Sequence, residues 1–433
     1  MSQIETATIQ HPLNSSRQVL LASLVGTAIE FFDFYIYATA AVLVFPRLFF
    51  PASDPATSVL ASLATFAIAF IARPVGSMIF GHFGDRIGRK KTLVMALMTM
   101  GLSTFMIGTL PPYHSIGVLS PVLLALCRFG QGIGLGGEWG GAVLLAVENA
   151  PASKRAWYGM FPQLGAPVGF FLSGGTFLLL SRWLTNDQFV AFGWRVPFLA
   201  SSVLVLQGLY VRLNITETLA FEATAKLGEQ ANIPALAVLR LHPRQLAAGV
   251  LGSIATFVIF YLMVVFTLSW GTTALHYSRT SFLLMQLVGV VFFALAIPLS
   301  AWLAEHGRRP VMFAVTGLIA IFGMFLAPLL TGGLVGVLIF MIVGFALTGV
   351  TFGPLGTVLS ELFPTSVRYT GSSLAFSMAG ILGASLAPYV ATWLATRYGL
   401  SYVGYYLAAS ACMTFAGLFL MRERETAFIH LQQ

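Results

Sequence analysis

Long apolar runs recur along the whole chain, and each is about as long as a membrane-spanning helix. A helix needs roughly 20 apolar residues to cross a bilayer, whereas the strands of a membrane barrel are about half as long and alternate in polarity. The runs therefore predict an all-α membrane protein with twelve spans, near residues 18–46, 58–83, 91–110, 119–147, 154–182, 192–213, 245–273, 280–304, 310–330, 333–360, 370–396 and 401–421.

A polar stretch divides the twelve runs six by six. We predict an N-terminal six-helix half at 1–213, a cytoplasmic linker at 214–244 and a C-terminal six-helix half at 245–433. Two motifs recur across the linker: Glu305 matches Asp85, and Glu361-Leu-Phe-Pro364 matches Glu148-Asn-Ala-Pro151. Both pairs of motifs fall at the same ends of corresponding helices. Six-span halves in parallel register are typical of two-domain secondary transporters.

Composition and charge agree with this picture. Hydrophobic residues make up 57% of the 433 residues and charged residues only 9%, against about 25% charged in soluble proteins, so lipid must cover much of the surface. Basic residues concentrate on the cytoplasmic side of membrane proteins. One side of the predicted bundle carries 16 of the 23 Lys and Arg, and the other carries 5. Both termini are therefore predicted to be cytoplasmic. The same bias accounts for the net charge of +8, so this charge does not indicate binding to nucleic acid.

Charged residues inside the spans are the strongest functional signal, because each costs roughly 2.5–3.5 kcal/mol to insert. Glu30 and Asp33 lie three residues apart in the first span, hence on one helical face. Arg128 lies about nine residues, or roughly 14 Å, into the fourth span. Our hypothesis is that Asp33 and Arg128 pair without substrate, and that protonation of Asp33 releases Arg128 for a substrate carboxylate. The alternative is a static pair that only fixes helix packing.

Two more charged residues are site candidates. Glu138 joins Glu30 and Asp33 as a candidate for proton coupling, although Glu30 and Glu138 could each serve helix packing instead. Arg73, directly before Pro74, is a candidate second contact for the substrate anion, or a partner for an acid on the first or fourth helix.

Polar and aromatic residues complete the predicted substrate site. Tyr37, Tyr261 and Gln286 are candidate substrate contacts, and for each one packing is the competing interpretation. The last six spans contain almost no charge, so we expect the first half to supply the electrostatics and the second to shape the pocket. The sequence has no metal-ligand spacing, catalytic set or phosphate loop. We therefore expect no enzyme activity, no metal and no cofactor.

The fourth span is rich in glycine. Gly132, Gly136 and Gly140 are spaced four residues apart inside an apolar helix, without the preceding strand that a dinucleotide loop requires. This spacing predicts close packing between helices.

Several motifs resemble a known transporter family. The segment 81–91, GHFGDRIGRKK, resembles the signature loop between helices 2 and 3 of the major facilitator superfamily. The segments at 29–37, 128–151, 193–198 and 361–371 further resemble its bacterial metabolite:proton symporter family, nearest to the shikimate-transporter branch. The resemblance covers essentially the whole chain.

The resemblance implies a function and a gate. It implies import of a small organic acid with protons, by alternating access, through a monomer in the lipid of the bacterial inner membrane. A zwitterion or osmolyte symporter of the same family is the main alternative, and drug efflux is another. The resemblance also implies a cytoplasmic gate that includes the signature loop and the repeated motifs. Its candidate residues are Asp85, Arg86, Arg89, Glu148, Arg155, Glu305, Arg308, Glu361 and Arg368.

Overall fold

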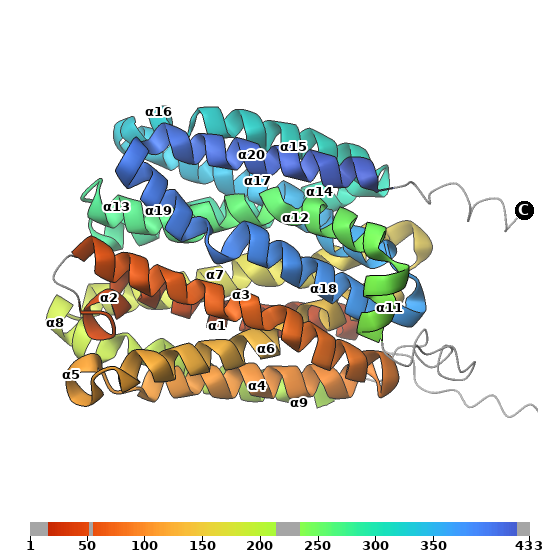
Figure 1. Cartoon of the computed structure of the whole chain (residues 1–433), viewed down its shortest axis with the longest axis horizontal. Coiled ribbons are helices and arrows are strands. Elements are labelled where there is room, and N and C mark those ends of the chain that lie inside the picture. Colours follow the sequence, from red (N-terminus) through yellow and green to blue (C-terminus); the bar gives the residue numbers. More distant parts are fainter. Residues whose placement is uncertain (1–15, 52–54, 214–233, 422–433) are drawn as a thin grey trace, which may run out of the picture.

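The structure is a computed structural model of the chain, which describes residues 16–51, 55–213 and 234–421. Every secondary-structure element in these ranges is helical, and the long helices run roughly side by side along the longest axis of the molecule (Figure 1). The first set of elements is α1 (Ser16–Leu43), α2 (Phe45–Leu48), α3 (Pro55–Arg86), α4 (Arg89–Thr109), α5 (Tyr113–Ile116), α6 (Leu119–Glu148), η1 (Ala152–Lys154), α7 (Arg155–Trp183), α8 (Asn186–Gln188), η2 (Phe189–Gly193) and α9 (Arg195–Leu213).

The second set follows the linker helix α11 (Pro234–Leu241). It comprises α12 (Pro243–Tyr261), η3 (Leu262–Phe266), α13 (Thr267–Thr273), α14 (Arg279–Glu305), α15 (Arg308–Met324), α16 (Leu326–Thr331), α17 (Gly333–Glu361), η4 (Thr365–Val367), α18 (Arg368–Gly380), η5 (Ile381–Ser385), α19 (Ala387–Tyr398) and α20 (Leu400–Leu420). The rest of the predicted linker, at 214–233, lies outside the described residues.

Helical segments occupy all twelve predicted spans. Within the described ranges, eleven are long and apolar enough to cross a membrane. The remaining segment is α15, of 17 residues, which α16 continues after a break at Phe325. Pro328 explains the break, because it lacks the N–H that would bond to the carbonyl of Met324 and continue one helix.

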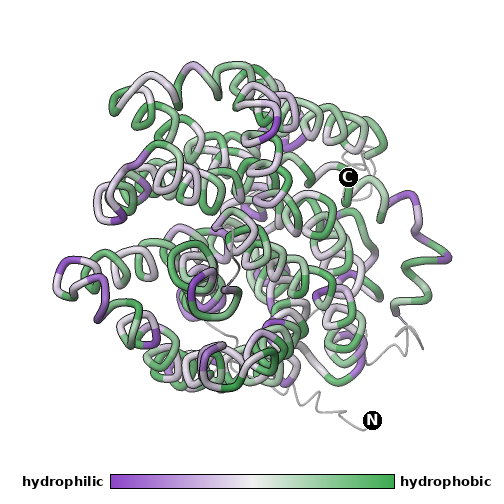
Figure 2. The backbone as a smooth tube through the Cα atoms, turned by 60° about the vertical axis from the view of Figure 1, so that its left-hand side comes forward, coloured by the Kyte–Doolittle hydropathy of each residue, from purple (hydrophilic) through white to green (hydrophobic). Residues whose placement is uncertain are grey.

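The outer faces of the helices are apolar, as lipid contact requires. Leu102, Leu126, Val203 and Leu295 each expose more than 60% of their surface. Most of the backbone in Figure 2 is coloured hydrophobic or near neutral, and the hydrophilic stretches are short.

The two sets of helices meet mainly through two pairs of elements. Helix α7 of the first set packs along α14, and α3 packs along α18. The linker helix α11 contacts α3 as well as α18, so it touches both sets. It lies at the end of the bundle that carries Arg86, Lys90, Arg155, Arg308 and Arg368, which we call the basic end (at the right in Figure 1).

The glycines of α6 allow α3 to approach closely. A Cβ on Gly132 would overlap the carbonyl oxygen of Ala69, and one on Gly136 would overlap that of Arg73. The third glycine, Gly140, faces Ser373 of the second set instead. The predicted close packing is therefore present, and it fixes the position of the α6 charges relative to α3.

We expect Gly136→Ala to destabilise the protein, because the new methyl group would push α3 away from α6. Overpacking of a helix contact costs typically 1–3 kcal/mol, so the melting temperature in detergent should fall clearly. Gly175→Ala is the matched control, since no atom lies within 4 Å of a Cβ at that position in α7. Equal melting temperatures for the two variants would contradict the packing argument.

Candidate functional site

Seven charged side chains are buried in the described part of the first set of helices. They are Glu30, Asp33, Arg73, Asp85, Arg128, Glu138 and Arg212, each at most 5% exposed. Among the described residues of the second set, no Asp, Glu, Lys or Arg is buried. Buried charge is thus confined to the first set among the described residues, as expected from the sequence. These charged side chains need partners within the same set.

Arg128 of α6 lies against two aromatic rings of α1. Its guanidinium carbon is 3.9 Å from the ring centre of Tyr37 and 4.4 Å from that of Phe34, distances at which cation–π attraction is strong. Its Nη1 donates a hydrogen bond of 3.0 Å to Oε1 of Gln131. The amide of Gln131 in turn donates to the hydroxyl of Thr104, at 2.7 Å.

Asp33 does not pair with Arg128, so the predicted direct ion pair is wrong for this structure. Its carboxylate is buried, has no hydrogen-bond partner among the described residues, and lies beside the hydroxyls of Thr104 and Ser201. Both hydroxyls donate to backbone carbonyls instead. The physical reason is helix rotation, because Asp33 points toward α4 and α9 whereas Phe34, about 100° further around α1, faces Arg128.

Two polar side chains, Thr104 and Gln131, lie between Asp33 and Arg128, although no hydrogen bond joins Asp33 to Thr104. Thr104 lies beside Asp33 and accepts from Gln131, and Gln131 accepts from Arg128. Only these two polar side chains therefore separate the charge of Asp33 from the guanidinium group of Arg128.

Arg73 pairs with the first acid of α1. Its Nη2 lies 3.6 Å from Oε1 of Glu30, and both side chains are buried. The guanidinium carbon also lies 5.3 Å from the ring centre of Phe376, which belongs to α18 in the second set. Of the two partners considered for Arg73, the structure thus selects the acid on the first helix.

Glu138 pairs with a residue that the sequence analysis did not place in the site. Arg212 of α9 forms a buried ion pair with Glu138 and also donates to the backbone carbonyl of Leu93, at 2.7 Å. Arg212 lies near the end of the predicted span 192–213 and is one of the 16 basic residues on the side predicted to be cytoplasmic. Two features of the sequence could have indicated this pair: Arg212 ends a long apolar run, and Glu138 has no obvious basic partner.

Aromatic rings from both sets meet beside these charges. Tyr261 of α12 contacts the ring of Phe34 at 5.9 Å and the ring of Phe70 at 5.4 Å. Phe31 of α1 contacts Phe352 of α17 at 6.1 Å. Tyr261 shares the ring of Phe34 with Arg128 and the ring of Phe70 with Arg73, so these three candidate contacts lie close together where the two sets meet.

The other two candidate substrate contacts have partners within the protein. The hydroxyl of Tyr37 bonds to the hydroxyl of Thr65 at 2.6 Å. The amide of Gln286 donates to the carbonyls of Met263 and Val264, which belong to the π-helical turn η3. Gln286 therefore stabilises an irregular turn of α12–η3, and its contact with substrate stays a prediction.

The repeated acids make equivalent contacts across the two sets at the basic end. Asp85, at the end of α3, accepts from the hydroxyl of Thr370 at 2.7 Å and from its backbone N–H at 3.3 Å. Glu305, at the end of α14, accepts from the backbone N–H of Trp157 at 2.7 Å. Both N–H groups lie in the first turn of a helix, where an acid is favoured by the helix dipole. Each half thus caps a helix of the other.

Further charged contacts surround these caps. Arg368 lies 3.9 Å from Glu148 of the other set, and Arg308 pairs with Glu361 at 2.9 Å within the second set. The backbone carbonyl of Arg155 accepts from Thr357, while Arg86 contacts His82 within α3. The side chain of Arg89 lies outside the described residues. The predicted gate residues therefore gather at one end, and their role in gating stays a prediction.

Removal of the Asp85 cap should loosen the basic end. We expect Asp85→Ala to increase hydrogen exchange of the backbone amides at 368–372 several-fold, because the Thr370 N–H loses its acceptor. Lys91→Ala, at an exposed position nearby, should leave exchange in this segment unchanged. Hydrogen exchange read by mass spectrometry compares the two variants, and equal protection would show that the cap does not hold the sets together.

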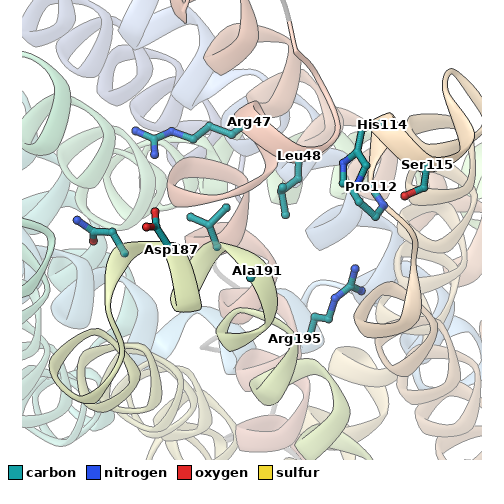
Figure 3. Close-up of a pocket in the computed structure, with 10 residues that line it drawn as sticks. Arg47, Leu48, Pro112, His114, Ser115, Asp187, Ala191 and Arg195 are labelled. Carbon is teal, nitrogen blue, oxygen red and sulfur yellow. The ribbon is translucent and has the colours of Figure 1, made fainter.

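A surface pocket of about 500 Å³ lies at the opposite end of the first set. Arg47 and Arg195 lie on different sides of it, and Asp187 and His114 also line it (Figure 3). None of the predicted site residues belongs to its lining, so it is separate from the buried charges.

Comparison with known proteins reveals similarity along nearly the whole chain. The model of the Major Facilitator Superfamily matches residues 23–388. The Inner membrane metabolite transport protein YhjE of Escherichia coli is 54% identical, with 97% of this chain and 98% of that protein covered. The Shikimate transporter of Escherichia coli is 36% identical, with 96% of each covered. The Proline/betaine transporter of Salmonella typhimurium is 33% identical, with 91% of this chain and 81% of that protein covered.

Among solved structures, the fold is similar to the proton:xylose symporter XylE bound to 6-bromo-6-deoxy-D-glucose. The TM-score is 0.73 at 19% identity, with 94% of this chain and 95% of that chain covered. At this identity the likeness concerns the fold alone.

Proposed function

Because the chain belongs to the major facilitator superfamily, whose members are membrane transporters, we propose that it imports a small organic acid together with protons by alternating access. The protein is a multi-pass membrane transporter and not an enzyme, as its relatives and its fold establish. The substrate class, the proton coupling and the direction of transport are the proposed part.

One observation carries the proposal: two arginines of the first set are buried, and the rings that they face, Phe34 and Phe70, both contact Tyr261 of the second set. Arg128 is 0% exposed, and Arg73 is 4% exposed. Arginine binds carboxylates through two parallel hydrogen bonds. The 3.6 Å ion pair of Arg73 with Glu30 is longer than a hydrogen bond, so a ligand carboxylate would compete with Glu30 for Arg73. A carboxylate that enters between the halves would reduce the electrostatic cost of burying these two guanidinium groups.

The buried acids support coupling to protons. An ionised carboxylate without a hydrogen-bond donor is costly to bury, and Asp33 has no such donor among the described residues. Protonation of Asp33 would remove its negative charge from the vicinity of Arg128 and leave the guanidinium more attractive to a substrate anion. In this proposal the charge of Asp33 acts on Arg128 electrostatically, across Thr104 and Gln131, and not through a direct ion pair.

The sidedness of the protein follows from the charge bias. We assign the basic end, and with it both termini, to the cytoplasm, since Lys and Arg are enriched on that side. In this arrangement the contacts of Asp85 and Glu305 close the path to the cytoplasm. A substrate would then enter from the opposite end, and these contacts would break when the halves rock.

Import of a zwitterion such as proline or betaine is the second candidate function, and the similarity to the Proline/betaine transporter favours it. Such a substrate carries a carboxylate for Arg128 as well. It also carries a cation, for which the aromatic rings where the two sets meet, such as Phe31 and Phe352, offer electron-rich faces.

Uptake into proteoliposomes with an imposed pH gradient tests the proposal. The wild-type protein should accumulate at least one acid from a panel of shikimate, quinate, dicarboxylates and aromatic acids, and an uncoupler should abolish the accumulation. Accumulation of proline or betaine alone would favour the second candidate. If the uncoupler leaves the accumulation of every transported acid unchanged, proton coupling is wrong.

A further inference from the structure

Tyr35 of α1 has a buried hydroxyl group that the protein does not satisfy. The side chain is 0% exposed, and its hydroxyl has no hydrogen-bond partner among the described residues. Two residues further along, the hydroxyl of Tyr37 bonds to Thr65. A buried hydroxyl without a partner is unfavourable and needs an explanation, and Phe would fill the same space without this penalty.

Packing fixes where this hydroxyl lies. The ring of Tyr35 stacks on Phe31 at 5.7 Å and meets Phe170 edge to face at 5.0 Å, both in the first set. It also contacts Phe260 of α12 in the second set, at 5.8 Å. The ring is therefore held at the contact between the halves, and its hydroxyl has no freedom to seek another partner without disrupting these contacts.

The hydroxyl of Tyr35 lies in the same region as the candidate anion site. Phe260, which contacts the ring of Tyr35, also contacts Tyr261 at 5.0 Å. Tyr261 in turn contacts the ring of Phe34, on which the guanidinium of Arg128 lies. A ligand whose carboxylate is held by an arginine would thus have its body within reach of Tyr35.

The surroundings favour a ring-shaped ligand. Several contacts that join the halves here are contacts between aromatic rings, such as Phe34 with Tyr261 and Tyr35 with Phe260. A ring in the ligand can replace these contacts when the halves separate, because it presents an apolar face at the same spacing. A linear dicarboxylate would have a second arginine for its second carboxylate, but it presents no flat apolar face to the aromatic rings.

We propose that Tyr35 determines specificity by hydrogen-bonding a hydroxyl group on the ring of a cyclic monocarboxylate. This inference rests on the proposed function and names the substrate class for the same site. The carboxylate binds Arg128 or Arg73, the ring lies among the aromatic side chains, and the hydroxyl satisfies Tyr35.

A cycle of two proteins and two ligands tests the role of Tyr35. The proteins are the wild type and Tyr35→Phe. The ligands are shikimate and cyclohex-1-ene-1-carboxylate, which has the same ring without hydroxyl groups. Competition for uptake in proteoliposomes gives the preference for shikimate in each protein. We expect Tyr35→Phe to reduce this preference about 3- to 10-fold, the effect of one hydrogen bond. Affinity for the ligand without hydroxyl groups should stay unchanged.

Two controls separate a specific effect from a structural one. Tyr402→Phe removes an exposed hydroxyl on α20 and should leave the preference at the wild-type value. The thermal stability of Tyr35→Phe should equal or exceed that of the wild type, because an unsatisfied group is removed.

Each of the following outcomes would overturn the inference. An unchanged preference in Tyr35→Phe, or an equal loss for both ligands, would reduce Tyr35 to a packing residue. Proton-coupled uptake of linear acids but of no cyclic acid would refute the substrate class and leave the proposed function intact. Absence of proton-coupled uptake for every acid would refute both the proposed function and this inference.

Discussion

Replacement of Asp33 by Asn is expected to abolish accumulation of substrate against its gradient. Asn fills the same volume but cannot bind and release a proton, so proton movement down the pH gradient can no longer drive uptake of the substrate. Exchange of substrate across the membrane needs no net proton movement and should continue. Uptake driven by a pH gradient, measured beside counterflow in the same proteoliposomes, separates the two activities.

The control for this variant is Asp187→Asn. Asp187 is an exposed acid of the first set, at the end opposite the basic end. Accumulation by this control should match the wild type. Normal accumulation by Asp33→Asn would exclude Asp33 as the proton carrier and would leave Glu30 and Glu138, both buried acids of the first set, as the remaining candidates.

Replacement of Arg128 by Lys is expected to weaken substrate binding about 30-fold or more. Lys keeps the positive charge but cannot lie flat on the rings of Tyr37 and Phe34 or bind a carboxylate through two parallel bonds. Loss of one partner of a buried, hydrogen-bonded charge pair typically costs 2–5 kcal/mol, and each 1.4 kcal/mol is a tenfold change. Binding to the purified protein, measured by the thermal shift across a concentration series, gives the affinities.

Arg397→Lys is the matched control, because Arg397 is exposed on α19. Its affinity should equal that of the wild type. If Arg128→Lys binds as tightly as the wild type, Arg128 has only a structural role, and Arg73 becomes the leading candidate for the carboxylate contact.

The contacts at the basic end relate the internal repeat to transport. Asp85 and Glu305 occupy matching positions in the two halves, and each accepts from the first turn of a helix in the other half. Because both contacts join the halves, neither half can move away from the other without breaking them. In the proposed function these contacts stabilise the state that is closed at the basic end. Binding of substrate and proton must then offset the free energy lost when the contacts break.

The sequence by itself determined the helical membrane-spanning segments and the location of the charged residues within them. These features are local. The thickness of the bilayer sets the length of each apolar run, and the cost of burying a charge makes Glu30, Asp33 and Arg128 conspicuous wherever they point. The spacing of Gly132 and Gly136 likewise predicted close helix packing before the neighbouring helix was known, because only a residue without Cβ allows such an approach.

Only the tertiary structure decided which charges pair. Arg128 lies against the rings of α1 and not against Asp33, and Glu138 finds its partner in Arg212, 74 residues away. Such pairing depends on the rotation of each helix about its axis and on the order in which the helices pack. Both are set by contacts spread over the whole bundle, so no local pattern of residues specifies them.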